Sequence, residues 1–200
     1  NSPALEWYTN SVVDIESLKL NSVSFSNNFV GLKSTSLFAN SFDLVLELVS
    51  CNFTGNKQGL SITPATFGRN LAFYIEDGYF AHNSGVDMGS AIRVESNEMW
   101  TWTMRNTRFE YNEGSSGGAV YIGDGTVTTS VIISLTWTNV SFLHNKANDK
   151  GGAILFISTS QTAVTWYWTT GVVNDNQASG GGAIYAQFDA LSANLTWSKV

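Results

Sequence analysis

A motif of about thirty residues recurs along this chain and limits the folds open to it. Each copy has an aromatic residue followed three positions later by asparagine, and successive copies are 27 to 33 residues apart. The anchor pairs are Phe25/Asn28, Phe53/Asn56, Phe80/Asn83, Phe109/Asn112 and Phe142/Asn145, with Val173/Asn176 as a variant. A fixed period of this length is the signature of a protein built from one stacked structural unit.

A glycine-rich segment follows most of the anchors. It reads Gly-Gly-Ala followed by Ile or Val at 117–120, 151–154 and 181–184, and Gly-Ser-Ala-Ile at 89–92. A degraded counterpart stands at Gly59-Leu60, and near Gly31-Leu32 the segment has been lost. Glycine permits sharp corners with unusual dihedral angles, and alanine fits where the backbone turns tightly inward. We therefore predict stacked corners at Gly118, Gly152 and Gly182.

Large apolar residues stand seven and five positions before each anchor. They are Leu18/Leu20, Leu46/Leu48, Phe73/Ile75, Trp102/Met104, Leu135/Trp137 and Trp166/Trp168. Alternation with a period of two predicts a half-buried strand. Each repeat therefore carries one strand before Phe-x-x-Asn and another at Gly-Gly-Ala-Ile, and no sustained pattern favours a helix.

Strand repeats of this length fit either a propeller blade or one coil of a parallel β-helix. A blade needs four antiparallel strands in roughly 40 to 50 residues, usually joined by Asn-Gly or Asp-Gly hairpins. The period here is shorter, and the chain has no Asn-Gly and only two Asp-Gly pairs. In a β-helix the repeated residues stack, with Phe on Phe and Asn in a hydrogen-bonded ladder. We predict an all-β, right-handed parallel β-helix (a solenoid) of about six coils, forming a single domain over residues 1–200.

The paired motif resembles the repeat of the chlamydial polymorphic outer-membrane proteins, which also occurs in other bacterial and eukaryotic surface proteins. The resemblance covers roughly residues 17–187 and is clearest from Phe80 onward. It implies a right-handed parallel β-helix displayed outside the cell, often as an adhesive passenger.

Composition and charge narrow the partners. The net charge is −6. Nucleic-acid binding usually needs a basic face, so we expect no nucleic-acid partner. No apolar run approaches membrane-spanning length, so we expect no membrane span. The single cysteine, Cys51, has no partner within the chain and is predicted to be a buried small hydrophobe. No cofactor or metal is expected.

We expect both ends of the solenoid to be continued by further coils or covered by another chain. The chain starts at Asn1 without methionine or a cleavable signal, and Leu195 and Trp197 match the paired strand positions of a coil whose anchor would lie beyond Val200. We expect the chain to be a mature fragment or an assembly unit. Its partners would be copies of itself or adjoining coils, placed end to end against Leu195 and Trp197.

Three glycosylation sequons occur, at Asn52-Phe53-Thr54, Asn139-Val140-Ser141 and Asn194-Leu195-Thr196. Asn52 and Asn139 stand just before anchors, in slots where a side chain can face solvent. They are equal candidates for glycosylation in a eukaryotic host. Asn194 enters a strand and is a weaker candidate.

Parallel β-helices also include polysaccharide lyases and hydrolases. Those enzymes need carboxylates that converge on one groove, with Lys, Arg or Ca²⁺ to stabilise charge. The acids here occupy different slots of different coils: Asp77, Asp87, Glu95, Glu98, Glu110, Glu113, Asp124, Asp149 and Asp175. His82 and His144 both stand two residues after an anchor Phe, but they are not in adjacent coils. We therefore predict that both histidines are solvent-facing turn residues.

The tryptophans allow two interpretations. Trp102, Trp137, Trp166 and Trp168 occupy apolar strand slots. An aromatic stack inside the core is favoured over a carbohydrate-binding platform on the surface.

The sequence thus predicts a non-enzymatic structural or adhesive β-helix protein at the cell surface or outside the cell. End-to-end stacking into a filament is favoured. One alternative is an adhesin that holds a binding face for a host receptor or glycan on a rigid stalk. The other is a polysaccharide lyase or hydrolase of the β-helix type.

Overall fold

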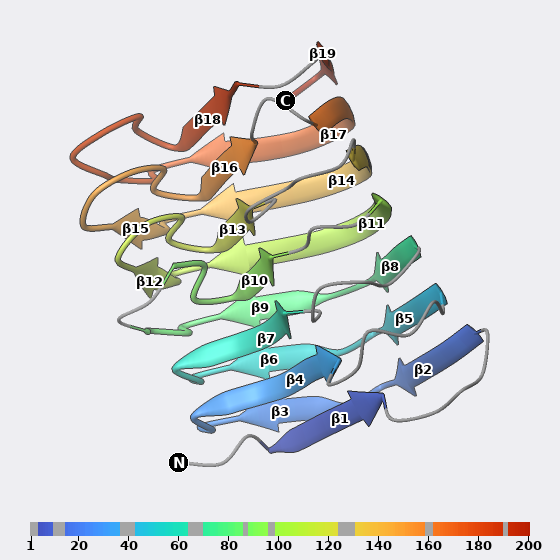
Figure 1. Ribbon diagram of the computed structural model, residues 1–200. Helices are drawn as coiled ribbons and strands as arrows, with labels where there is room; N and C mark the ends of the chain where they lie inside the picture. The colour runs from blue at the N-terminus through green and yellow to red at the C-terminus, as the bar shows by residue number, and fades with distance from the viewer. Residues whose placement is uncertain are drawn as a thin grey trace.

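The chain winds into a right-handed parallel β-helix in the computed structural model (Figure 1). The structure describes residues 4–9, 15–36, 43–63, 70–85, 88–95, 99–123, 131–158, 162–189 and 192–200. Every strand in this part of the chain pairs in parallel with its equivalent one coil away, and no helix occurs there. The predicted all-β solenoid of about six coils is confirmed.

Two large sheets form the walls of the coil. The first has seven strands, in the order β1 (Leu5–Thr9), β4 (Val30–Ser36), β7 (Gln58–Thr63), β10 (Ile92–Glu95), β13 (Val120–Gly123), β16 (Ile154–Ser158) and β18 (Ile184–Phe188). The second contains β2 (Ile15–Asn21), β5 (Asp43–Val49), β8 (Asn70–Glu76), β11 (Met99–Glu110), β14 (Val131–Leu143), β17 (Thr162–Asn174) and β19 (Ser192–Ser198).

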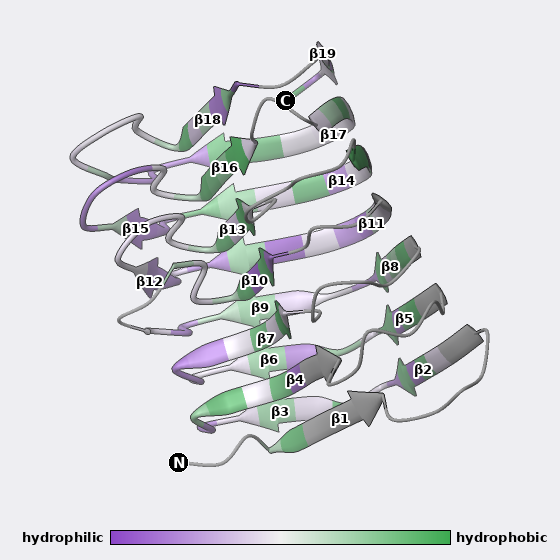
Figure 2. Cartoon of the chain, viewed as in Figure 1, coloured by the Kyte–Doolittle hydropathy of each residue, from purple (hydrophilic) through white to green (hydrophobic). Residues whose placement is uncertain are grey.

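The Phe-x-x-Asn element forms a further stretch of the second sheet. In the early coils it is a separate short strand, β3 (Ser24–Ser26), β6 (Asn52–Thr54) or β9 (Tyr79–Ala81). In β11, β14 and β17 it continues the preceding strand, which therefore reaches 12 or 13 residues. The later coils also carry β12 (Glu113–Gly114) and β15 (Lys146–Ala147), which pair with each other. Figure 2 shows these two short strands as hydrophilic, whereas β16 is mostly hydrophobic.

Residues with left-handed backbone bend each coil on both sides of the Phe strand. One column precedes the Phe strand and contains Ser22, Ser50, Asp77, Asn106, Asn139, Thr170 and Lys199. The other follows the Phe strand and contains Asn27, Gly55, His82, Tyr111, His144 and Asp175. Asn and Asp tolerate this conformation better than most residues. The bends let both parts of the second sheet face one interior.

The glycine pairs combine two different requirements. The first glycine of each pair forms the left-handed corner, with φ of 57° at Gly117 and 59° at Gly151. The second lies against the neighbouring backbone, because a Cβ at Gly152 would come within 2.5 Å of the amide nitrogen of Gln177. The predicted corners at Gly118 and Gly152 are therefore placed one residue too late. Gly182 does have a left-handed φ, of 47°.

A column of small residues follows these corners. The register pairs Leu32 with Leu60 and Leu60 with Ile92, so Gly31 and Gly59 align with the alanine of later coils. A Cβ at Gly59 would lie 2.6 Å from the carbonyl oxygen of Ala91. Gly59-Leu60 is thus the counterpart of Ala91-Ile92, which confirms that it is a degraded copy of the glycine segment.

The interior is filled by stacked rings. Phe53, Phe80, Phe109 and Phe142 are 0% exposed and stack with ring centroids 4.8, 4.9 and 4.6 Å apart. Trp100, Trp102, Trp137, Trp166 and Trp168 are also buried. The predicted phenylalanine ladder and the predicted tryptophan core stack are both confirmed, and Cys51 is buried as expected.

An asparagine ladder lines the turn after the Phe strand. The side-chain amide of Asn83 donates to Asn112 Oδ1 at 2.9 Å and to the carbonyl oxygen of Phe53 at 2.9 Å. Its own Oδ1 accepts from the backbone and side-chain nitrogens of Asn56, both at 3.1 Å. The same pattern continues through Asn145 to Asn176. Buried polar groups are thereby satisfied from coil to coil, as the repeat predicted.

Candidate surfaces for assembly and recognition

Two apolar side chains of β19 extend columns of the core, but no further strand in the described part of the chain covers them. Leu195 pairs with Trp166 and Trp197 with Trp168, whose side chains are 0% exposed. Leu195 itself is 41% and Trp197 43% exposed. The ring of Trp197 packs edge-on against Trp166, with centroids 5.2 Å apart. The two predicted assembly residues therefore lie side by side on one apolar edge, which we call the open edge.

The opposite end of the solenoid is apolar as well. Leu18 and Leu20 occupy the same two core columns on β2 and are only partly buried. Leu5 on β1 is 38% exposed. Both ends thus present aliphatic or aromatic side chains, together with the unpaired backbone groups of a sheet edge.

The three sequons lie on three different coils, and all three asparagines are exposed. Asn52 belongs to β6 and Asn194 to β19. Asn139 occupies a left-handed corner of β14, where its side-chain Nδ2 donates to Asn106 Oδ1 at 3.0 Å. The prediction that the slots of Asn52 and Asn139 face solvent is confirmed.

Among the described residues, no group of acidic side chains converges on one site. Instead, several pair locally: Glu95 with Arg93, Glu110 with Arg108, and Glu113 with Lys146. No group of three or more His, Cys, Asp and Glu side chains in the described ranges could hold a metal ion. Asp87, Glu98 and Asp124 lie outside the described residues.

The two histidines belong to an external ring stack. His82, Tyr111 and His144 lie in successive coils, with ring centroids 5.1 and 4.9 Å apart. The Nδ1 atom of His144 is 3.6 Å from a carboxylate oxygen of Asp175. The histidines are exposed turn residues, as predicted, but the tyrosine that joins them in one stack was not anticipated.

Two tyrosines next to glutamates have shifted acidity. Burial raises the pKa of Tyr79, and its hydrogen bond to Glu110 at 3.0 Å adds to the effect. The hydrogen bond from Tyr74 to Glu76, at 2.6 Å, raises the pKa of Tyr74. Both phenols therefore remain protonated donors at neutral pH. Their role is to hold carboxylates in place on the sheet surface.

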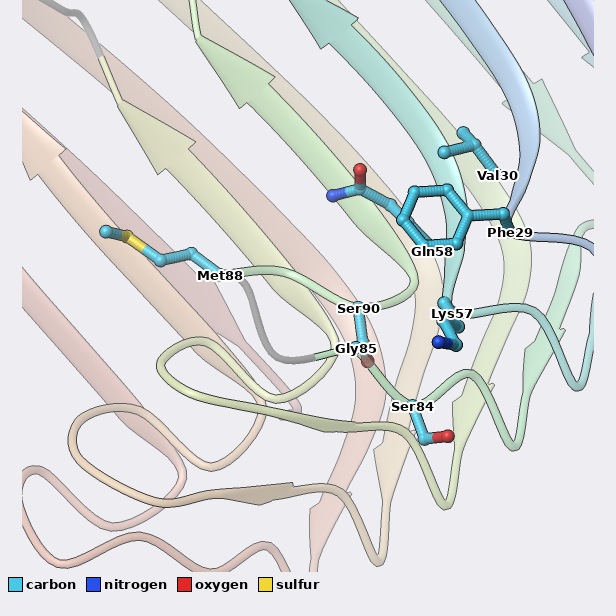
Figure 3. Close-up of a pocket in the computed structure, with 8 residues that line it drawn as sticks. All are labelled: Phe29, Val30, Lys57, Gln58, Ser84, Gly85, Met88 and Ser90. Atoms are coloured by element: carbon cyan, nitrogen blue, oxygen red, sulfur yellow. The ribbon is translucent and has the colours of Figure 1, made fainter. Parts of the chain in front are cut away.

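A shallow hollow opens beside the turns of the early coils (Figure 3). It is lined by Phe29, Val30, Lys57, Gln58, Ser84, Gly85, Met88 and Ser90. Phe29 is 43% exposed, and the ammonium of Lys57 lies 5.3 Å from its ring centre. None of the described residues that line the hollow carries a carboxylate or an imidazole, so this set lacks the groups of an acid–base site. No repeat position marked this hollow in the sequence.

Comparison with known families matches two stretches of the solenoid. Residues 139–156 and 171–187 match the repeat of the Chlamydia polymorphic membrane proteins. Both stretches contain the anchor and the glycine segment of one coil, and they bear out the resemblance drawn from the motif. No curated protein and no solved structure matches the chain. Among the described residues, no helix is long and apolar enough to cross a membrane.

Proposed function

We propose that this protein is a non-enzymatic β-helix module that acts outside the cell or on its surface. The repeat and the parallel β-helix fit a protein of the surface or adhesin type. A solenoid of this kind is rigid because each coil is fixed by parallel pairing on both sides. Such a body can hold a binding face away from a membrane or build an extended structure.

Two coils match a repeat of surface proteins, and this match carries the proposal. The open edge bears on how copies of the module are arranged. Leu195 and Trp197 continue the columns of the fully buried Trp166 and Trp168, yet both remain more than 40% exposed. Burial of a large apolar side chain contributes roughly 1.5–3 kcal/mol. A further coil placed on β19 would bury both side chains and pair its backbone groups. We propose end-to-end stacking, with the first coil of the next copy, including β1 and β2, as the covering element.

An adhesive role is the second candidate, and the surface-protein repeat favours it. In that case further coils of the same polypeptide would cover the open edge, and a lateral face would bind a receptor or glycan. The two candidates predict different behaviour of the isolated chain, because only the stacking candidate requires association between copies.

Charged residues at the open edge are expected to block assembly. Replacing Leu195 and Trp197 by glutamate would place two carboxylates where a second coil must pack, and desolvating them is costly. The sedimentation coefficient should fall to that of a monomer, and fibres should disappear in electron microscopy. Circular dichroism should show that the coils from Phe53 to Phe142 stay folded.

Ile132→Glu is the matched control for this experiment. Ile132 is 54% exposed on β14, a strand that is paired on both sides with β11 and β17, and it alternates with the buried Val131 and Ile133. Assembly should survive this change. Filaments that persist in the Leu195/Trp197 variant would refute stacking, and so would a wild-type chain that is monomeric at all concentrations. Either result would favour the adhesin.

Glycan attachment at Asn52 and Asn139 is expected when the chain is secreted by a eukaryotic cell. Both asparagines are exposed, and a glycan at either would project from the side of the solenoid. Peptide mapping by mass spectrometry should find both sites occupied, with Asn194 less occupied. Each of Asn52→Gln and Asn139→Gln should remove one glycan mass. Unmodified Asn52 and Asn139 in such a host would contradict the assignment.

The rival polysaccharide lyase or hydrolase makes a distinct prediction. It requires cleavage of acidic polysaccharides by the purified chain, with or without Ca²⁺. Product formation would overturn the non-enzymatic proposal.

A further inference from the structure

Short hydroxyl side chains cover the outer surface of the last four rungs of the second sheet. Three neighbouring columns of outward residues on β11, β14, β17 and β19 together form what we call the hydroxyl face. The columns are Thr101, Ser134, Thr165 and Asn194; Thr103, Thr136, Tyr167 and Thr196; and Arg105, Thr138, Thr169 and Ser198. Nine of these twelve positions hold threonine or serine. The residues between them, such as Trp102 and Trp137, point into the core.

The hydroxyl face is regular in two directions. Pairing runs without a bulge from Thr101 to Arg105 and through the equivalent residues of the next three strands. Neighbouring strands are therefore roughly 4.8 Å apart, and alternate residues along a strand roughly 6.6–6.8 Å apart. Thr138 and Thr169 hold their hydroxyl oxygens 3.2 Å from each other. Since β-branched side chains are stiff at χ1, the columns form a repeating array.

The hydroxyl face is also nearly free of charge. Among the twelve residues, Arg105, at one corner, is the only one with a basic or carboxylate side chain. The same columns carry Lys19, Glu47 and Glu76 on the earlier rungs. The neutral array is thus confined to four successive strands, where each threonine offers one methyl and one hydroxyl group.

We propose that the hydroxyl face binds ice, an activity that goes beyond the surface role proposed above. An ice surface is uncharged and extended, and its water oxygens repeat at lengths close to both spacings of the array. The hydroxyl groups take the place of lattice waters, while the methyl groups fill the spaces between them. Each contact is weak, but the rigid solenoid holds all of them in position before binding, which removes the entropic cost of ordering.

Two other occupants fit these residues less well. Sugar recognition uses aromatic platforms and a few placed polar groups within a concave site, and the face has one exposed aromatic side chain, Tyr167. The buried centre of a protein interface is enriched in aromatic and apolar residues. A regular field of threonines matches neither pattern.

The test uses the purified chain in a nanolitre osmometer and in an ice-recrystallisation assay. Wild-type protein should shape ice crystals and show thermal hysteresis. Thr136→Lys and Thr138→Lys should abolish both effects, because each lysine stands above the array and keeps its own hydration shell. Tyr167→Thr should increase hysteresis, since it completes the central column and removes a protruding ring.

Ser24→Lys provides the matched control. Ser24 is an exposed strand residue of the same sheet on β3, far from the array. It receives the same change of hydroxyl to lysine and should keep wild-type activity. Circular dichroism should confirm that all variants are folded.

Several outcomes would overturn the proposal. Absent hysteresis and absent crystal shaping in the wild type would do so, as would full activity in folded Thr136→Lys. Retention on an insoluble neutral polysaccharide without ice activity would identify a glycan surface. A dimer that Thr136→Lys separates, again without ice activity, would identify an interface between copies.

Discussion

Replacing Phe109 by alanine is expected to destabilise the protein by about 3–5 kcal/mol, the usual cost of removing a buried phenylalanine. Its ring is fully buried between Phe80 and Phe142, with centroid distances of 4.9 and 4.6 Å. Neither neighbour can move into the gap without leaving its own place in the stack. Urea unfolding followed by circular dichroism would measure the change in the free energy of unfolding.

Phe29→Ala serves as the control for this measurement. Phe29 lies outside the ring stack and is 43% exposed, so the same truncation should cost less than about 1 kcal/mol. If Phe109→Ala also costs less than about 1 kcal/mol, the phenylalanines do not share one column and the register is wrong.

Replacing Gly152 by valine is expected to disrupt its own coil and the coil on each side. A Cβ there would lie 2.5 Å from the nitrogen and 2.6 Å from the oxygen of Gln177, both backbone atoms. That backbone is held by hydrogen bonds to Asn145 and Ala147, at 2.9 and 2.8 Å. Overpacking of this kind typically costs about 1–3 kcal/mol, and more where the neighbour is fixed.

Hydrogen exchange and limited proteolysis would locate the damage from Gly152→Val. Protection should fall in β13, β16 and β18, because each coil contacts only its neighbours, while β4 and β7 should be spared. Gly180→Val is the matched control, since a Cβ at Gly180 would meet its nearest atoms at 3.5 Å. Wild-type protease resistance of the Gly152 variant would show that the close approach at this glycine is absent.

The repeat was sufficient to predict the strands and their stacking order. Phe-x-x-Asn and the alternating apolar pairs recur at nearly constant spacing, so equivalent residues of adjacent coils have only one consistent register. The observed pairings of Phe53 with Phe80 and of Leu46 with Phe73 are those that the spacing predicted. Local periodicity carries this information because a solenoid contains few contacts beyond neighbouring coils.

The detail within each coil was less accessible. Gly151 and Gly152 are identical in the sequence, yet one has a left-handed φ and the other has no room for a side chain. Only the position of the neighbouring backbone distinguishes them. Strand pairing was also needed to align Gly31 and Gly59 with the alanine of later coils. The first coils lack the Gly-Gly-Ala motif, so the sequence alone does not show which of its positions these two glycines occupy.

The sequence by itself determined the fold class, the core columns and the residues at the open edge, because these follow from the repeat period. Only the tertiary structure decided which polar residues form a common surface. Thr103, Thr136 and Thr196 are scattered along the chain, and parallel pairing in register brings them into one column. The side chains of Thr103 and Thr136 are fixed outward because the alternate residues of the same strands, Trp102 and Trp137, fill the interior. The hydroxyl face is therefore a product of stacking, which places residues about thirty positions apart at the distance between two strands.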